Sequence, residues 1–219
     1  YAVQLNDTHP TVAIPELLRL LVEEAGMRFA DAVQVAHDTF AYTNHTIMPE
    51  ALEKWDQKLF RGVLPRVYPY VKKLDALLRR TLEQRGVPMG EVSRYAILED
   101  GMVHMARMAI FATHSTNGVA RLHTEILKDT ALHEWYELYP ERFNNKTNGV
   151  TQRRWLALAN PELAALLHDA VGDGWLTDLS QLKRLEPCAD DPAFLARFMD
   201  VKREKKRQLA AYVEKHEGV

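Results

Sequence analysis

The chain has 219 residues, of which 47% are hydrophobic, and this is enough to bury a sizeable core. Its 28 basic and 30 acidic side chains leave a formal net charge of -2, so neither nucleic acid nor an acidic membrane surface would attract it as a whole. No apolar stretch approaches the roughly 20 residues that cross a bilayer, and the single cysteine, Cys188, excludes an internal disulfide framework. These properties predict a globular, cytoplasmic protein that binds neither nucleic acid nor membrane.

The first part of the chain predicts alternating strands and helices. Residues 1–5 form an apolar strand, and a polar loop leads to a helix over 11–24, where Pro15 fits because the first turn needs no amide hydrogen bond. A second helix over 30–38 is followed by a short buried strand over 40–43. Such alternation is typical of an α/β fold with a parallel sheet.

The middle of the chain is predicted to be mostly helical. Residues 49–85 favour helices that Pro65 and Pro69 interrupt and that Gly86 ends. Three further elements are expected: a helix or strand over 101–113, and helices over 119–128 and 132–138.

The last part favours helices alone, over 162–169 and 193–215, and the second of these begins at the capping sequence Asp190-Asp191-Pro192. We therefore place a domain boundary near residues 148–151 and expect a helix-rich α/β protein with parts of two domains, 1–150 and 151–219. The chain starts directly in a strand and stops after a charged helix, so we expect it to be a piece of a longer protein.

Three polar loops follow apolar segments, at residues 6–10, 114–118 and 145–155. Open α/β sheets place ligand-binding groups where strands end, so these loops predict a shared binding site. The alternative is that their Asn and Asp residues are ordinary turn residues and helix caps.

Other kinds of site are disfavoured by the spacing of the residues. The segment His133-Glu134-Trp135-Tyr136-Glu137 lacks the second histidine of a zinc-protease helix, and no other histidine pair has ligand spacing with a carboxylate, so we expect no metal. Cys188 has no histidine context for a thiol nucleophile. The basic run 202–207 is flanked by acids and is typical of a solvated helix face.

The chemistry of the three loops favours a hydroxyl-rich, neutral ligand such as a sugar. Asp, His and Asn side chains supply hydrogen-bond donors and acceptors, and buried polar groups of this kind discriminate strongly against a ligand that leaves them unpaired. Arg153 and Arg154, beside Trp155, add cationic and stacking groups for a phosphate or a flat ring, although arginines after a loop are also common on surfaces.

Four segments carry a family resemblance, in family order: Val3-Gln4-Leu5-Asn6-Asp7-Thr8-His9-Pro10, Ala41-Tyr42-Thr43-Asn44-His45-Thr46, Asn117-Gly118-Val119-Ala120-Arg121 and Lys146-Thr147-Asn148-Gly149. With them the chain closely resembles the α-glucan phosphorylases, the family of glycogen, starch and maltodextrin phosphorylases. The similarity covers essentially the whole chain. Gln152 departs from it, because the family usually has proline before the paired arginines, and we expect a looser turn there.

The resemblance implies a two-domain glycosyltransferase-B fold, of which this chain is the end of the N-terminal domain and the start of the C-terminal domain. It implies a hexosyltransferase, a homodimer that carries out the reversible phosphorolysis of terminal α-1,4-linked glucose from an α-glucan to glucose 1-phosphate. The substrates are the glucan and inorganic phosphate. The cofactor is pyridoxal 5′-phosphate, which acts through its phosphate in the active-site cleft between the domains.

The resemblance also implies roles for individual residues. His114 would contact the glucosyl unit, and Asn148 would hydrogen-bond its 6-hydroxyl group. Asp7 and His9 would line the pocket beside the anomeric carbon, with Asp7 and His114 as catalytic residues. Trp155 would pack near the cofactor.

The family's cofactor lysine lies in a Gly-Thr-Ser-Asn-Met-Lys segment that these 219 residues do not contain. We therefore expect the isolated chain to bind no pyridoxal phosphate and to be inactive. Two other classes remain open from the residues alone: a non-catalytic carbohydrate-binding module, which needs exposed aromatic platforms, and a helical interaction domain.

Overall fold

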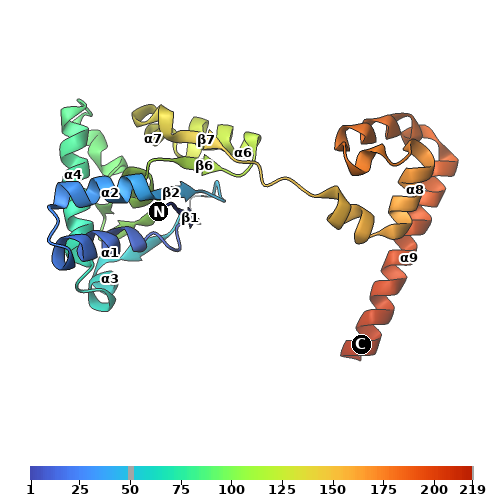
Figure 1. Cartoon of the computed structure of the whole chain (residues 1–219), viewed down its shortest axis with the longest axis horizontal. Coiled ribbons are helices and arrows are strands. Elements are labelled where there is room, and N and C mark those ends of the chain that lie inside the picture. Colours follow the sequence, from blue (N-terminus) through green and yellow to red (C-terminus); the bar gives the residue numbers. More distant parts are fainter. Residues whose placement is uncertain (49–51, 219) are drawn as a thin grey trace. The chain divides into compact units, whose positions relative to one another are not determined.

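The computed structural model describes residues 1–48 and 52–218, which form two compact units, 1–148 and 149–219 (Figure 1). Unit 1 is helix-rich and contains a parallel sheet, so the predicted α/β class is confirmed. The described part of unit 2 consists of helices and turns. That the two units are the end of one domain and the start of another stays a prediction. Within the described ranges, no helix combines the length and apolarity that a membrane crossing requires.

The parallel sheet of unit 1 has the strand order β1-β2-β6-β7. Its strands are β1 (Val3–Asn6), β2 (Phe40–Thr43), β6 (Thr116–Gly118) and β7 (Phe143–Asn145). In the register of β1 with β2, Leu5 lies opposite Tyr42, and both side chains are buried in the core. Because all four strands run in one direction, their carboxyl ends meet at the same edge of the sheet.

Helices connect these strands, as the alternating pattern predicts. Between β1 and β2 lie α1 (Ala13–Arg19), which continues as one wider turn through Glu24, and α2 (Phe29–Thr39). Helix α5 (Met105–Ala112) leads into β6, and α6 (Arg121–Ile126) and α7 (His133–Leu138) lie between β6 and β7. Pro15 lies in the first turn of α1, as expected. The buried faces of these helices form one core with the sheet.

A long insertion separates β2 from α5, and here the predicted helix over 49–85 is partly wrong. Residues 49–51 lie outside the described residues, and β3 (Lys54–Asp56) is a strand. It pairs with β5 (Met102–His104), which pairs in turn with β4 (Leu98–Glu99) in a small antiparallel sheet. Cross-strand pairing overrides the local helical preference at these three residues.

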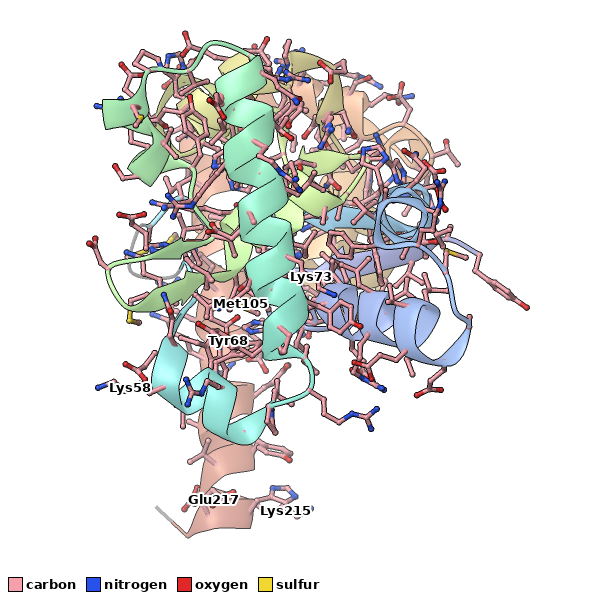
Figure 2. All side chains as sticks on the ribbon, turned by 90° about the vertical axis from the view of Figure 1, so that its left-hand side faces the viewer. Lys58, Tyr68, Lys73, Met105, Lys215 and Glu217 are labelled. Atoms are coloured by element: carbon pink, nitrogen blue, oxygen red, sulfur yellow. The ribbon has the colours of Figure 1, made fainter. Side chains whose placement is uncertain are left out.

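Two helices follow in the insertion, α3 (Gln57–Val63) and α4 (Tyr68–Gln84), with Pro65 between them and Pro69 in the first turn of α4. The hydroxyl of Tyr68, labelled at the start of α4 in Figure 2, donates to Gln57 Oε1 at 3.0 Å and ties the two helices together. A row of buried side chains at helical spacing faces the core from α4: Val71, Leu74, Leu78 and Leu82.

Unit 2 has its own small core around Leu167, Val171 and Trp175. Its main helices are α8 (Pro161–Val171) and α9 (Pro192–Glu217), which confirm the two helices predicted there. The carboxylate of Asp191 accepts a hydrogen bond from the amide of Ala193 at 2.9 Å, so the predicted capping of α9 is also confirmed.

Candidate functional site

The carboxyl edge of the parallel sheet gathers polar side chains from successive strands. Immediately after β1, Asp7 adopts a left-handed backbone with φ of 66°, a conformation that is uncommon outside glycine. Its amide donates to the carbonyl of Thr43 at 3.0 Å, and its Oδ1 accepts from the amide of Thr8 at 2.8 Å. The sheet and the following turn therefore hold Asp7 in this backbone conformation, with its side chain half-buried at the edge.

A row of hydrogen bonds crosses the strand ends. His45, just after β2, lies with its Nε2 2.6 Å from Oδ1 of Asn6, and both side chains are exposed. The hydroxyl of Thr43 donates to Oδ1 of Asn117 on β6 at 2.9 Å and accepts from Gln4 at 2.7 Å. Amide, imidazole and hydroxyl groups from β1, β2 and β6 thus form one polar row.

Alternate residues of the same segment are buried behind this row. Asn44 is fully buried, and its Nδ2 donates to the Tyr42 hydroxyl at 3.0 Å while its Oδ1 accepts from the amide of Thr46 at 2.9 Å. Burial raises the pKa of Tyr42, so its hydroxyl keeps its proton. The backbone amide of Asn44 donates to the carbonyl of Asn117 at 2.8 Å. Asn44 therefore fixes the turn that carries His45 at the edge.

Glu53, in the insertion between β2 and α5, lies at one side of the site and contacts Thr8, His9 and Trp55. Its Oε2 accepts from the Thr8 hydroxyl at 2.9 Å and lies 3.9 Å from Nδ1 of His9, and its Oε1 accepts from the indole of Trp55 at 2.8 Å. The ring of His9 remains 79% exposed. An apolar cavity of about 130 Å³ lies beside it, with Trp55 and Phe60 in its wall. The ring of His9 therefore lies between the carboxylate of Glu53 and this apolar cavity.

Asn148 reaches the same edge from β7. Its amide donates to the carbonyl of Val119 at 3.0 Å, directly after β6, and the amide of Lys146 donates to the carbonyl of Gly118 at 3.1 Å. The side chain of Asn148 is exposed. Three of the predicted site residues, Asp7, His9 and Asn148, are thus placed at one edge of one sheet.

His114 lies before β6, at the amino end of the sheet, and its predicted contact with the glucosyl unit stays a prediction. The apolar segment before it is helix α5, so the residues after His114 enter strand β6 instead of leaving one. The amide of His114 donates to the carbonyl of Phe40 at the start of β2, whereas the amide of Asp7 donates to Thr43 at its end. Three extended residues correspond to about 10 Å along the sheet. His114 lies beside His37, whose carbonyl is 2.9 Å from its Nδ1.

The sequence prediction omitted His45 and Glu53 from the site, and it included Asn6 only as part of the loop over 6–10. The signal for His45 was present, since a polar triplet follows the buried strand over 40–43, as it follows the strand before Asp7. No local pattern marks Glu53, because the insertion and the small antiparallel sheet bring it to Thr8 and His9.

Trp155 belongs to unit 2, on a wide helical turn over Arg153–Leu158, and it is 65% exposed. Arg153 donates to the carbonyl of Leu176 at 2.9 Å. An open indole face beside cationic side chains fits one wall of a site for a flat, phosphorylated cofactor. The side-chain amide of Gln152 donates to the carbonyls of Trp175 and Leu176 at 3.3 and 3.0 Å, and the looser turn expected at this residue stays a prediction.

The edge offers hydrogen-bond donors and acceptors, two imidazoles and two carboxylates in an arrangement that suits a ligand with several hydroxyl groups. Across residues 1–48 and 52–218, no three His, Cys, Asp or Glu side chains lie together in a way that could hold a metal ion. Trp135 and Trp175 are buried, so two of the four tryptophans cannot form an exposed aromatic platform for a carbohydrate.

Comparison with known proteins gives a family. The family model for carbohydrate phosphorylases matches residues 1–219. The glycogen phosphorylase of Bacillus subtilis (strain 168) is 43% identical over 95% of this chain, and that of Synechocystis sp. is 44% identical over 97%. The brain form of glycogen phosphorylase from Bos taurus is 42% identical over 100% of the chain.

In each case the chain spans 26% of the length of the relative that it matches. The match to the family model runs from the first residue to the last and includes every strand of the candidate site. The chain belongs to the carbohydrate phosphorylase family.

Proposed function

We propose that the whole protein, of which this chain corresponds to about a quarter of the length of its relatives, catalyses the reversible phosphorolysis of α-1,4-glucans to glucose 1-phosphate. The observation that carries the proposal is the polar row at the carboxyl edge of the sheet, in a chain that matches the phosphorylase family throughout. The relatives are glycogen phosphorylases, which supports an α-glucan and inorganic phosphate as the substrates.

The residues at the edge have distinct parts in this proposal. Asn148 and His45 hydrogen-bond hydroxyl groups of the terminal glucose, and Asn6 orients the ring of His45 through the 2.6 Å contact. The half-buried carboxylate of Asp7 faces the anomeric carbon, where positive charge develops as the glycosidic bond breaks. His9 lies beside the same carbon, held by Glu53.

In the whole protein, unit 1 is the end of the N-terminal domain and unit 2 the start of the C-terminal domain of a two-domain glycosyltransferase-B fold, and the enzyme is a homodimer. Trp155 covers one face of pyridoxal phosphate, and its exposure supports this role. When bound, the cofactor supplies a phosphate group that exchanges a proton with the substrate phosphate. His114 is also proposed to contact the glucosyl unit, and its exposed side chain lies about three extended residues along the sheet from Thr43.

Two histidine variants of the whole protein test the proposal. His45→Ala removes a hydrogen-bonding group from the edge, and the loss of one preorganised polar group predicts a fall of about a hundredfold in kcat. The matched control is His133→Ala on α7, which removes the same side chain away from the strand ends and should keep kcat within about threefold. Asn148→Ala should lower kcat at least as much as it raises KM for the glucan.

The assay is the release of glucose 1-phosphate from maltodextrin in the presence of inorganic phosphate. No release by the unmodified whole protein would contradict the proposed reaction. Near-normal kinetics for His45→Ala and Asn148→Ala would contradict the proposed site. A loss in His133→Ala equal to that in His45→Ala would also contradict it, because the effect would then not be specific to the edge.

A further inference from the structure

The turn between β6 and α6 connects the candidate site to the first turn of a helix. It comprises Gly118, Val119 and Ala120, and none of these side chains has a part in the proposed reaction. The backbone of Val119 makes two hydrogen bonds in opposite directions. Its amide donates to Nδ1 of His123 at 3.0 Å, and its carbonyl accepts from the amide of Asn148 at 3.0 Å. One residue therefore joins His123 to Asn148.

A second contact fixes the same turn on the side of the helix. The hydroxyl of Thr124 is buried and lies 3.0 Å from both the carbonyl of Ala120 and Oδ1 of Asn145, so its single proton serves one of them at a time. A Cβ on Gly118 would come within 2.5 Å of this hydroxyl oxygen. Helix α6 thus approaches the strand end at a distance that only glycine allows.

The hydrogen bond from Val119 determines the protonation of His123. Because a backbone N–H is the donor, Nδ1 must be the unprotonated nitrogen of a neutral ring, and the proton resides on Nε2. That Nε2 is buried and has no hydrogen-bond partner within the part of the chain that the structure describes. Among the described residues, the imidazole of His123 therefore hydrogen-bonds through Nδ1, to the amide of Val119 in the turn.

We propose that His123 is a positioning residue of the sugar site, which acts by accepting from the amide of Val119 and so holds the carbonyl that fixes Asn148. The inference rests on the proposed function, in which Asn148 hydrogen-bonds the 6-hydroxyl of glucose. Asn148 is exposed and is the last residue of unit 1. Among the described residues, the hydrogen bond from its amide to the carbonyl of Val119 ties its backbone to the end of β6. His123 itself does not touch the sugar.

Two substitutions of His123 in the whole protein separate this role from a general structural one. His123→Phe keeps a ring of similar size but removes the acceptor. His123→Asn keeps an acceptor oxygen near the position of Nδ1. Each variant is assayed in the synthetic direction with a maltodextrin acceptor and either glucose 1-phosphate or 6-deoxyglucose 1-phosphate, which lacks only the hydroxyl that Asn148 would bind.

With glucose 1-phosphate, His123→Phe should lower kcat/KM about tenfold, and His123→Asn should recover most of the loss. With the 6-deoxy donor, His123→Phe should change kcat/KM by less than about twofold, because Asn148 has no hydroxyl to bind. The double variant with Asn148→Ala should lose no more than Asn148→Ala alone. A matched control is His133→Phe on α7, whose ring contacts the backbone carbonyl of Lys128 at 2.9 Å and which should leave the kinetics with both donors unchanged.

The results distinguish the two proposals. If Asn148→Ala does not discriminate between the two donors, the assignment of Asn148 to the 6-hydroxyl fails, and the proposed site fails with it. If Asn148→Ala discriminates but His123→Phe lowers both donors equally, or adds its loss to that of Asn148→Ala, the positioning role of His123 is wrong and the proposed site stands. Failure of His123→Asn to recover activity would also overturn it.

Discussion

The buried imidazole of His104 should make the protein lose stability in mild acid. His104 ends β5 and is 8% exposed, and its Nε2 is buried with no hydrogen-bond partner among residues 1–48 and 52–218. Burial, followed by the positive charges of Arg107 and Lys54, lowers its pKa from 6.5 to about 4. The carboxylate of Asp100 opposes this effect but does not outweigh it.

The sign of the effect follows from proton binding. Between pH 6.5 and about 4, the unfolded chain binds a proton at His104 and the folded chain does not, so protons favour unfolding in this window. The free energy of unfolding therefore keeps its full value with respect to His104 above pH 6.5. It falls progressively as the pH drops from 6.5 to about 4. One pKa unit corresponds to about 1.4 kcal/mol, so the full loss is about 3 kcal/mol. This is a large share of the stability of a typical protein.

The assay compares urea unfolding of the protein and its His104→Gln variant at several pH values from 8 to 4. Other groups titrate alike in both, so the difference in the free energy of unfolding isolates His104. This difference should shift by about 3 kcal/mol across the window and stay constant above pH 7. Lys54→Met should reduce the shift, because it removes one of the charges that lower the pKa. A difference that does not vary with pH would refute the reasoning.

Three further substitutions should change stability, each measured by the midpoint of urea unfolding. Asp75→Ala removes a buried carboxylate that accepts from the amides of Ile97 and Leu98 and from the guanidinium of Arg79. It should lower the free energy of unfolding by about 3 kcal/mol, and Asp75→Asn, which keeps one acceptor oxygen, should lower it by less. Gly118→Ala should cost more than about 1 kcal/mol, because its Cβ would come within 2.5 Å of the Thr124 hydroxyl, and Thr124→Ala in the same chain should recover part of the loss. Asn160→Ala removes the cap of α8, where Oδ1 accepts from the amide of Leu163 at 3.1 Å, and should cost about 1 kcal/mol; no change would mean that this helix end does not need its cap.

The sequence predicts the parallel sheet well where a strand is bounded on both sides. The strand over 40–43 matches β2 residue for residue, because Phe40 and Tyr42 alternate with less buried neighbours and a polar triplet ends the run. The helix ends are also well marked, since Pro15 and Pro69 can occupy only a first turn. These are local rules, and here the tertiary structure agrees with them.

The small antiparallel sheet escapes the same rules because its strands have only two or three residues, too few for a period to be recognised. One signal was available. Asp100 and Gly101 both have left-handed backbones, with φ of 50° and 74°, as a tight hairpin turn between β4 and β5 requires. An Asp-Gly pair is a strong hairpin signal, but the short flanking strands hid it in a segment that otherwise favours helices.

His45 and His114, at opposite ends of the sheet, show when a polar loop is a reliable sign of a binding site. A polar loop predicts a site only if the apolar run before it is a strand, since only then does the loop leave the carboxyl edge. The run before His45 has four residues and alternates, whereas the run before His114 has eight and is buried almost all round, as a central helix is. An apolar run of four to eight residues can be a strand or part of a buried helix, so the alternation favours a strand before His45, whereas the helix before His114 is known from the structure. Applied in this form, the rule selects His45 together with Asp7, and it makes no prediction for His114, whose loop follows a helix.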